Sequence, residues 1–214
     1  MIEVLSSESQ AMREALVALG RRYLAAGWVF GTAGNLSGRV ADRAVVTASG
    51  RHLGDLTTDD FVEVALDGTL THAAPGDRPS AEASIHLALY RALPEVKCGL
   101  HVHTVASTLL QADDHPVEPG TPSHVVFSGL EMIKGWGLWD PDAIARLPLF
   151  DNHASVPQIA RDVERYYGNT QNSAFVPALA ISGHGLTAWG ASAFAANRHL
   201  EVAEFLCQIA HARG

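Results

Sequence analysis

The sequence contains few of the features that mark secreted or membrane-bound proteins. Only two cysteines, Cys98 and Cys207, occur among its 214 residues, so free thiols are expected rather than a disulfide framework. No stretch reaches the roughly 18 apolar residues of a membrane-spanning helix. The opening residues, MIEVLSSESQ, lack the basic and apolar regions of a signal peptide. We therefore expect a cytoplasmic protein with no membrane partner.

Clusters of positive charge are also lacking. The formal net charge is −8, and the 15 lysines and arginines do not gather in any one segment. Affinity for nucleic acid depends on neutralising several phosphates at once, so no nucleic-acid partner is expected. One small phosphate ester remains possible, because backbone N–H groups and hydroxyls can hold it in a local pocket.

The composition is that of an ordinary globular protein, with 47% hydrophobic and 18% charged residues, and we expect a single domain over residues 1–214. Ser80 and Ser192 are the expected N-caps of two of the helices. Apolar spacing predicts helices at residues 8–27, 80–93, 105–111, 156–167 and 192–212, and strands at 45–47, 61–66, 99–104, 125–127, 147–150, 178–182 and 186–189. This order favours a mixed α/β fold, in which helices cover a mainly antiparallel sheet.

Two histidines in the segment GLHVHT are candidates for metal ligands. In a strand, residues two apart project from the same face, so His101 and His103 would present two imidazoles together. Cys98 has the opposite parity and should point away. The alternative is that both histidines are hydrogen-bonded residues of a partly buried strand.

A third histidine, His184, lies in the segment SGHGLTAWG between two apolar strands. Its flanking glycines would let the backbone come close to a metal or ligand. Alone, it is an ordinary turn histidine. Together, the three histidines would make the open site of a catalytic zinc ion, which leaves one position for water or substrate.

Two glutamates compete for the role of general base. Glu82 lies early in the helix expected from Ser80, where an acidic side chain also suits the helix dipole. Glu131 lies in the segment GLEMIKGWG, whose apolar character would favour a raised carboxyl pKa. The alternative for Glu131 is an ion pair with Lys134.

Three short stretches offer amides and hydroxyls of the kind that hold a phosphate: GNLS at residues 34–37, TASG at 47–50, and Ser80. The signal is weak, because similar stretches occur in ordinary turns. The sequence contains neither a Walker lysine motif nor a G-x-G-x-x-G motif, so it does not indicate a nucleotide site.

Taken in order, the motifs GTAGNLSGR, TASG, PSAEASIH, HVH and SGHGLTAWG resemble the class II aldolase/adducin family over nearly the whole chain. The resemblance implies a three-layer α/β/α fold with a central, mainly antiparallel sheet, and a small phosphorylated ketose as substrate. It also implies a homotetramer with active sites between subunits, and one Zn²⁺ per subunit on His101, His103 and His184. The phosphate pocket that it implies consists of Thr32, Gly34, Asn35, Ser49, Gly50 and Ser80.

Within the family, GLEMIKGWG resembles a segment of sugar-phosphate dehydratases in which the glutamate is the acid/base, and this implies that role for Glu131. Aldolase and 4-epimerase relatives use the glutamate that matches Glu82, and fuculose-phosphate aldolases add a tyrosine near the C-terminus. No tyrosine follows Tyr167 here, which disfavours the aldolase. A non-catalytic, adducin-like module would not need the histidines.

Overall fold

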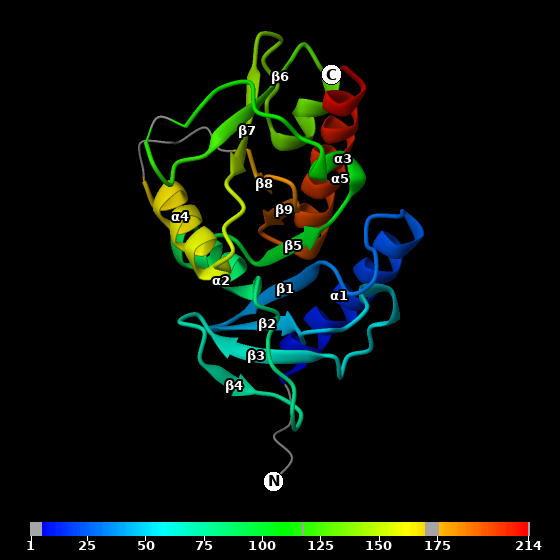
Figure 1. The fold of residues 1–214 in the computed structure, drawn as a ribbon. Coiled ribbons are helices and arrows are strands. Elements are labelled where there is room, and N and C mark those ends of the chain that lie inside the picture. Colours follow the sequence, from blue (N-terminus) through cyan, green and yellow to red (C-terminus); the bar gives the residue numbers. More distant parts are fainter. Residues whose placement is uncertain (1–5, 117, 170–175, 214) are drawn as a thin grey trace.

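A single mixed sheet organises the part of the chain that the computed structural model describes, which is residues 6–116, 118–169 and 176–213 (Figure 1). Its nine strands follow the order β4-β3-β2-β1-β5-β9-β8-β7-β6. Every neighbouring pair is antiparallel except β7 and β8, so the expected mainly antiparallel sheet is confirmed. The strands are β1 (Asn35–Val40), β2 (Arg43–Thr47), β3 (Phe61–Ala65), β4 (Leu70–His72), β5 (Cys98–Val102), β6 (Ser123–Ser128), β7 (Ile144–Phe150), β8 (Ala178–Ile181) and β9 (Gly185–Gly190).

Helices cover both faces of this sheet, which confirms the three-layer architecture (Figure 1). One face carries α1 (Ser7–Ala25), α3 (Val105–Thr108) and α5 (Ala193–Arg213), with the short 3-10 helices η1 (Leu53–Asp55) and η2 (Glu131–Trp136). The other face carries α2 (Ala83–Ala92) and α4 (Val156–Gly168). Each face buries its own apolar cluster, because alternate residues of a strand point to opposite sides of the sheet.

The cysteines confirm this alternation. Cys98 is fully buried among the residues under α1 and α5, as are Leu100 and Val102 on the same strand. His101 has the opposite parity and therefore faces the α2 side. Cys98 and Cys207 are both free, as expected.

One predicted helix start is confirmed and another is wrong. Ser192 caps α5, because its Oγ accepts a hydrogen bond from the N–H of Ala195 at 3.1 Å. Ser80 does not cap α2, whose first residue is Ala83. The segment before α2 is extended instead, since Pro79 pairs with Ala48 in an isolated bridge and the Ser80 N–H donates to the carbonyl of Thr47.

The sequence pattern missed β4, a strand of three largely exposed residues at the edge of the sheet. Such a short strand carries no apolar alternation from which to predict it. None of the helices in the described part of the chain has the length and apolar character needed to cross a membrane.

Candidate metal centre

The three predicted histidine ligands converge at one point. The Nε2 atom of His103 lies 2.9 Å from that of His101 and 3.1 Å from that of His184. His101 belongs to β5, His103 follows its end, and His184 forms the turn between β8 and β9. Strand pairing thus brings together side chains that are about 80 residues apart in the sequence.

Pairing between β5 and β9 also orients the first of these rings. His101 lies opposite Thr187 in the register, and the Thr187 hydroxyl is 2.9 Å from Nδ1 of His101. This contact leaves Nε2 of His101 to face the other two histidines. A hydrogen bond to the remote ring nitrogen is the usual device that fixes a metal-binding imidazole.

Two glycines allow the close approach of backbone that the centre requires. A side chain on Gly34 would meet the carbonyl oxygen of His101 at 2.7 Å, and its φ of +85° also disfavours any other residue. A side chain on Gly185 would lie 2.5 Å from the carbonyl oxygen of Val102 and press on both rings of the HVH segment. Gly34 and Gly185 are therefore required sterically, whereas a Cβ atom on Gly183, on the other side of His184, would meet nothing within 4 Å.

Glu82 joins the histidines as a fourth member. One of its carboxylate oxygens lies 2.8 Å from Nε2 of His184, and the other lies 3.6 Å from Nε2 of His101. The side-chain amide of Asn35 donates a 2.9 Å hydrogen bond to the second oxygen. The four potential ligand atoms all lie within 4.8 Å of one another.

The surroundings favour protonation states that suit a metal. Burial lowers the pKa of His101 to about 3, against a smaller opposing effect of Glu82, and burial also lowers the pKa of His103. Burial alone would raise the pKa of Glu82, but the hydrogen bond with His184 and the nearby imidazoles outweigh it and bring the pKa to about 2. Neutral imidazoles with an ionised carboxylate are the donor set that zinc and neighbouring transition metals bind, so these residues fit such an ion.

Two threonines that sequence reasoning missed hold this centre in place. Thr187 contacts His101, as described above. Thr108 donates hydrogen bonds to the carbonyl oxygens of Thr104 and His184, at 2.8 and 3.1 Å, and so ties the turn that carries His184 to α3. Thr187 was detectable once β5 and β9 were paired in register, whereas nothing in the sequence indicates the role of Thr108.

The residues expected to bind phosphate lie on segments next to Glu82. Ser80 is two residues before Glu82, and the antiparallel bridge between Ala48 and Pro79 places Thr47 opposite Ser80 and Ser49 opposite Arg78. Asn35 directly contacts Glu82, and Thr32 and Gly34 precede it in the turn that leads into β1. The Ser49 N–H donates to the carbonyl of Arg78 at 2.8 Å, which leaves the hydroxyl rather than the amide of Ser49 for a ligand. Phosphate binding by this set stays a prediction.

Glu131 does not belong to the group of four in a single copy of the chain. It begins η2, where Ile133 and Trp136 are buried and Glu131 points outward, with 84% of its side chain exposed. Its carboxylate pairs with Nζ of Lys134 at 2.9 Å. The apolar surroundings expected for Glu131 are therefore wrong, because the apolar neighbours in its sequence segment pack against α5 and leave the carboxylate in solvent.

Comparison with known proteins identifies relatives over most of the chain. The model of the class II aldolase and adducin N-terminal domain matches residues 14–211. A methylthioribulose-1-phosphate dehydratase of Leptospira biflexa serovar Patoc is 43% identical over 195 residues, which cover 89% of this chain and 92% of the relative. A protein of the same name from Microcystis aeruginosa is 39% identical over 196 residues, or 91% of this chain and 92% of the relative.

Solved structures share the fold. YgbL from Escherichia coli, described as a putative aldolase/epimerase/decarboxylase, superimposes with a TM-score of 0.76 at 25% identity, over 96% of this chain and 91% of that chain. An L-fuculose 1-phosphate aldolase superimposes with a TM-score of 0.73 at 18% identity, over 98% of this chain and 87% of that chain.

Proposed function

The chain belongs to the class II aldolase and adducin family, and we propose that it dehydrates 5-methylthioribulose 1-phosphate. It is an enzyme of the lyase class. The products would be 2,3-diketo-5-methylthiopentyl 1-phosphate and water, a step of methionine salvage. We further propose one Zn²⁺ per subunit, a homotetramer of single-domain subunits, and a place in the cytoplasm without nucleic-acid or membrane partners.

The observation that carries this proposal is the convergence of three imidazoles and one carboxylate from distant parts of the chain. His101, His103 and His184 would hold the ion. When bound there, a zinc ion supplies Lewis acidity that draws electron density from the ketone oxygen of a substrate. The chain's own residues would supply the proton transfers and the positioning.

We assign Glu131 the proton transfers. As a base, its carboxylate would take the proton from C3, and the electron pair of that C–H bond would form a C3–C4 double bond as the C4–O bond breaks. The acid form of Glu131 would then return the proton to the departing hydroxyl, which leaves as water. The resulting enol at C3 becomes the second ketone by moving its proton to C4.

Glu131 would act on a substrate that is held at the histidines of a neighbouring subunit. Its carboxylate is exposed, and η2 packs on α5, whereas His101 faces the α2 side of the sheet. A homotetramer with sites between subunits would bring Glu131 of one copy to the metal centre of another. Glu82 would orient His184 and the substrate. The phosphate would be held by the pocket that consists of Thr32, Gly34, Asn35, Ser49, Gly50 and Ser80.

One observation favours a second candidate, a ketose-phosphate aldolase or 4-epimerase. Glu82, which matches the glutamate used by those relatives, contacts the histidines directly, whereas Glu131 does not in one copy. The fold of an L-fuculose 1-phosphate aldolase also covers 98% of this chain. Both candidates require the same metal, so the reaction itself must separate them.

The test is to incubate the purified, zinc-loaded protein with 5-methylthioribulose 1-phosphate, and separately with fuculose 1-phosphate and ribulose 5-phosphate. Product analysis by mass spectrometry and NMR should find loss of one water from the methylthio sugar, with no aldehyde fragments and no epimer. Elemental analysis should find one zinc ion per chain. Cleavage or epimerisation without water loss would replace the dehydratase with the second candidate.

A further inference from the structure

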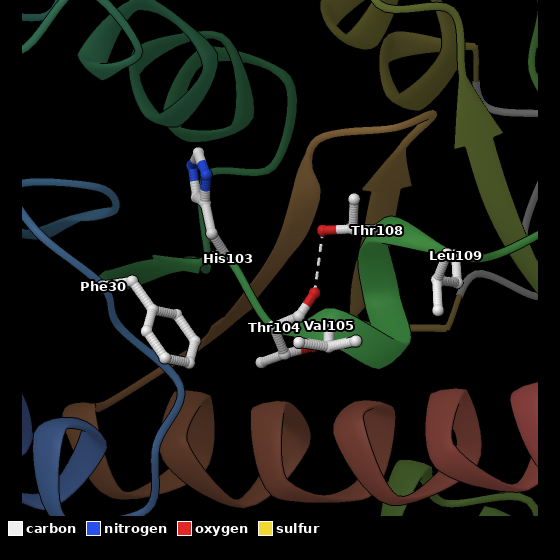
Figure 2. A pocket seen from close by; sticks show the side chains of 6 residues that line it. All are labelled: Phe30, His103, Thr104, Val105, Thr108 and Leu109. Carbon is white, nitrogen blue, oxygen red and sulfur yellow. Dashed lines mark hydrogen bonds between the residues drawn. The ribbon is translucent and has the colours of Figure 1, made fainter.

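An apolar hollow lies directly beside the metal centre. It measures about 260 Å³ and is bordered by the chain before β1, by the residue that ends the HVH segment and by α3. Figure 2 draws the residues that line it: Phe30, His103, Thr104, Val105, Thr108 and Leu109. It is large enough for a few non-hydrogen atoms of a ligand.

The walls of this hollow offer a ligand almost no hydrogen-bonding partners. Phe30, Val105 and Leu109 are large apolar side chains that are 57, 65 and 49% exposed. The two threonine hydroxyls already have partners within the protein. That of Thr104 donates to the buried Glu204 carboxylate at 2.5 Å. That of Thr108 donates to the carbonyl oxygen of Thr104, as Figure 2 shows, and to that of His184. Apolar groups therefore face the space, and a sugar hydroxyl placed there would find no free hydrogen-bonding partner on the walls.

The hollow is lined by Phe30 and by residues of and next to α3, whereas Ser80, expected to bind phosphate, lies two residues before Glu82. His103 borders the hollow, and its ring points away from Thr104 and Val105 (Figure 2), with its Nε2 atom 2.9 Å from that of His101. Of the residues expected to bind phosphate, Asn35 contacts Glu82, and Ser49 lies next to the bridge of Ala48 with Pro79, while Thr32 and Gly34 follow Phe30 in the turn before β1. A substrate whose reacting carbons sit at the histidines would extend one end toward each region.

We propose that this hollow holds the 5-methylthio end of the substrate, an inference that rests on the proposed function. In 5-methylthioribulose 1-phosphate, the phosphate and the methylthio group are attached at opposite ends of the carbons that react. The thioether is the apolar end, and it matches walls that lack free donors and acceptors. The same walls would favour the thioether over the C5 hydroxyl of an ordinary ketose phosphate.

The proposal is tested with two alcohols that cannot undergo the reaction, 5-methylthioribitol 1-phosphate and ribitol 1-phosphate. Calorimetry on the zinc-loaded protein should give a preference of roughly 10- to 200-fold for the methylthio compound, as expected for a methyl-sized group in an apolar pocket. Phe30→Ala and Leu109→Ser should each lower this preference severalfold, with little change in the affinity for ribitol 1-phosphate. Phe194→Ala is the matched control. Phe194 is an exposed phenylalanine in the first turn of α5, which follows the end of β9 that is remote from His184. This variant should keep the wild-type preference for the methylthio compound.

Turnover of the methylthio sugar by the wild-type protein separates failure of this inference from failure of the proposed function. If the wild type releases water from that sugar and both variants keep its preference, the hollow does not hold the methylthio group although the function stands. If the two variants bind both analogues more weakly, by the same factor, and the mass of their assembly falls, the hollow is a contact between subunits. The inference is then wrong. If the wild type releases no water from the methylthio sugar, the proposed function fails and the inference falls with it.

Discussion

At the scale of single residues, the metal centre depends on contacts made by atoms that do not face it. Nδ1 of His101 contacts Thr187, and the backbone carbonyl of His184 accepts from Thr108. The first contact leaves Nε2 of His101 free to face the other rings, and Nε2 of His103 lies about 3 Å from the Nε2 atoms of both other histidines. The centre is therefore pre-organised by neutral hydroxyl groups rather than by further charges.

The first prediction concerns Glu131. The variant Glu131→Gln should lower kcat for water loss by at least about two orders of magnitude, as expected when a general acid/base is removed. Bound zinc should be unchanged, because Glu131 lies outside the group of four ligand atoms. Steady-state kinetics and elemental analysis on the same preparation measure both quantities.

Glu14→Gln is the control for this experiment, since Glu14 is an exposed acid on α1 that contacts only Gln10 among the hydrogen bonds observed for it. It should behave as the wild type. Near-normal turnover of Glu131→Gln would remove Glu131 from the mechanism and assign the proton transfer to Glu82.

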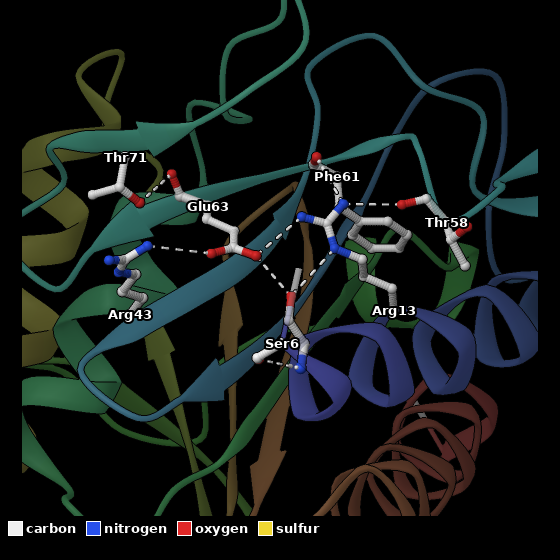
Figure 3. Close-up of polar contacts among 8 residues, drawn as sticks. Ser6, Arg13, Arg43, Thr58, Phe61, Glu63 and Thr71 are labelled. Atoms are coloured by element: carbon white, nitrogen blue, oxygen red, sulfur yellow. Dashed lines mark hydrogen bonds and ion pairs between the residues drawn. The ribbon is translucent and has the colours of Figure 1, made fainter. Parts of the chain in front are cut away.

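At the scale of secondary-structure elements, a buried ion pair fixes α1 to the sheet (Figure 3). The Arg13 guanidinium contacts the carboxylate of Glu63 on β3 at 3.2 Å and donates to the carbonyl oxygens of Thr58 and Phe61. The Glu63 carboxylate also accepts from the Ser9 hydroxyl at 2.7 Å. The side chains of Arg13 and Glu63 are only 3 and 11% exposed. Removing either partner would therefore leave a buried, unpaired charge and lower the free energy of unfolding.

The second prediction follows from this pair. Arg13→Met should lower the free energy of unfolding by about 3 kcal/mol or more, because it leaves the Glu63 carboxylate buried without its main partner. The double variant Arg13→Met with Glu63→Leu should regain much of that loss. Urea denaturation followed by circular dichroism measures both.

Arg22→Met, on the same helix, is the matched control. Arg22 pairs with Glu201, and both side chains are well exposed, at 60 and 38%. Its loss should cost less than about 1 kcal/mol, as for other surface ion pairs. Equal losses for the Arg13 and Arg22 variants would contradict the anchoring role of the buried pair.

At the scale of the whole molecule, the sheet order determines which segments can share a site. Because β5 lies between β1 and β9, Asn35, His101 and Thr187 become neighbours across three strands. The same arrangement leaves η2 packed against α5 on the opposite face, with Glu131 exposed. The proposed homotetramer would bring Glu131 of one copy to the histidines of another, although the two lie on opposite faces of the sheet in each copy.

The third prediction tests this shared site by mixing two inactive variants. Glu131→Gln and His184→Ala should each be inactive alone, but mixed oligomers should regain activity well above either parent. They would contain sites with intact histidines from one subunit and an intact Glu131 from another. The variants are co-expressed with different affinity tags, and the doubly purified species is assayed.

A mixture of two copies of Glu131→Gln with different tags is the control, and it should stay inactive. The mass of the wild-type protein, measured by light scattering, should be that of a tetramer. Failure of the mixed species to regain activity would mean that Glu131 serves its own subunit or takes no part in catalysis.

The sequence alone predicted the five α-helices, apart from the start of α2, most of the strands and the three candidate histidines, because these depend on local patterns. Period-two alternation predicted that His101 and Cys98 lie on opposite faces of their strand, and the glycines beside His184 predicted a close approach of backbone, which occurs at Gly185. These signals are carried within a few residues of each feature. The family resemblance added the three-layer architecture, which the structure confirms.

Only the tertiary structure decided how distant segments meet. It placed Glu82 beside the histidines, replaced the expected cap at Ser80 with an extended segment paired to Ala48, and turned Glu131 into solvent although its sequence neighbours are apolar. Each of these outcomes depends on which strand pairs with which and on which side of a short helix is buried. Local periodicity carries no information about that choice, because the free energy that decides it comes from contacts between segments far apart in the chain.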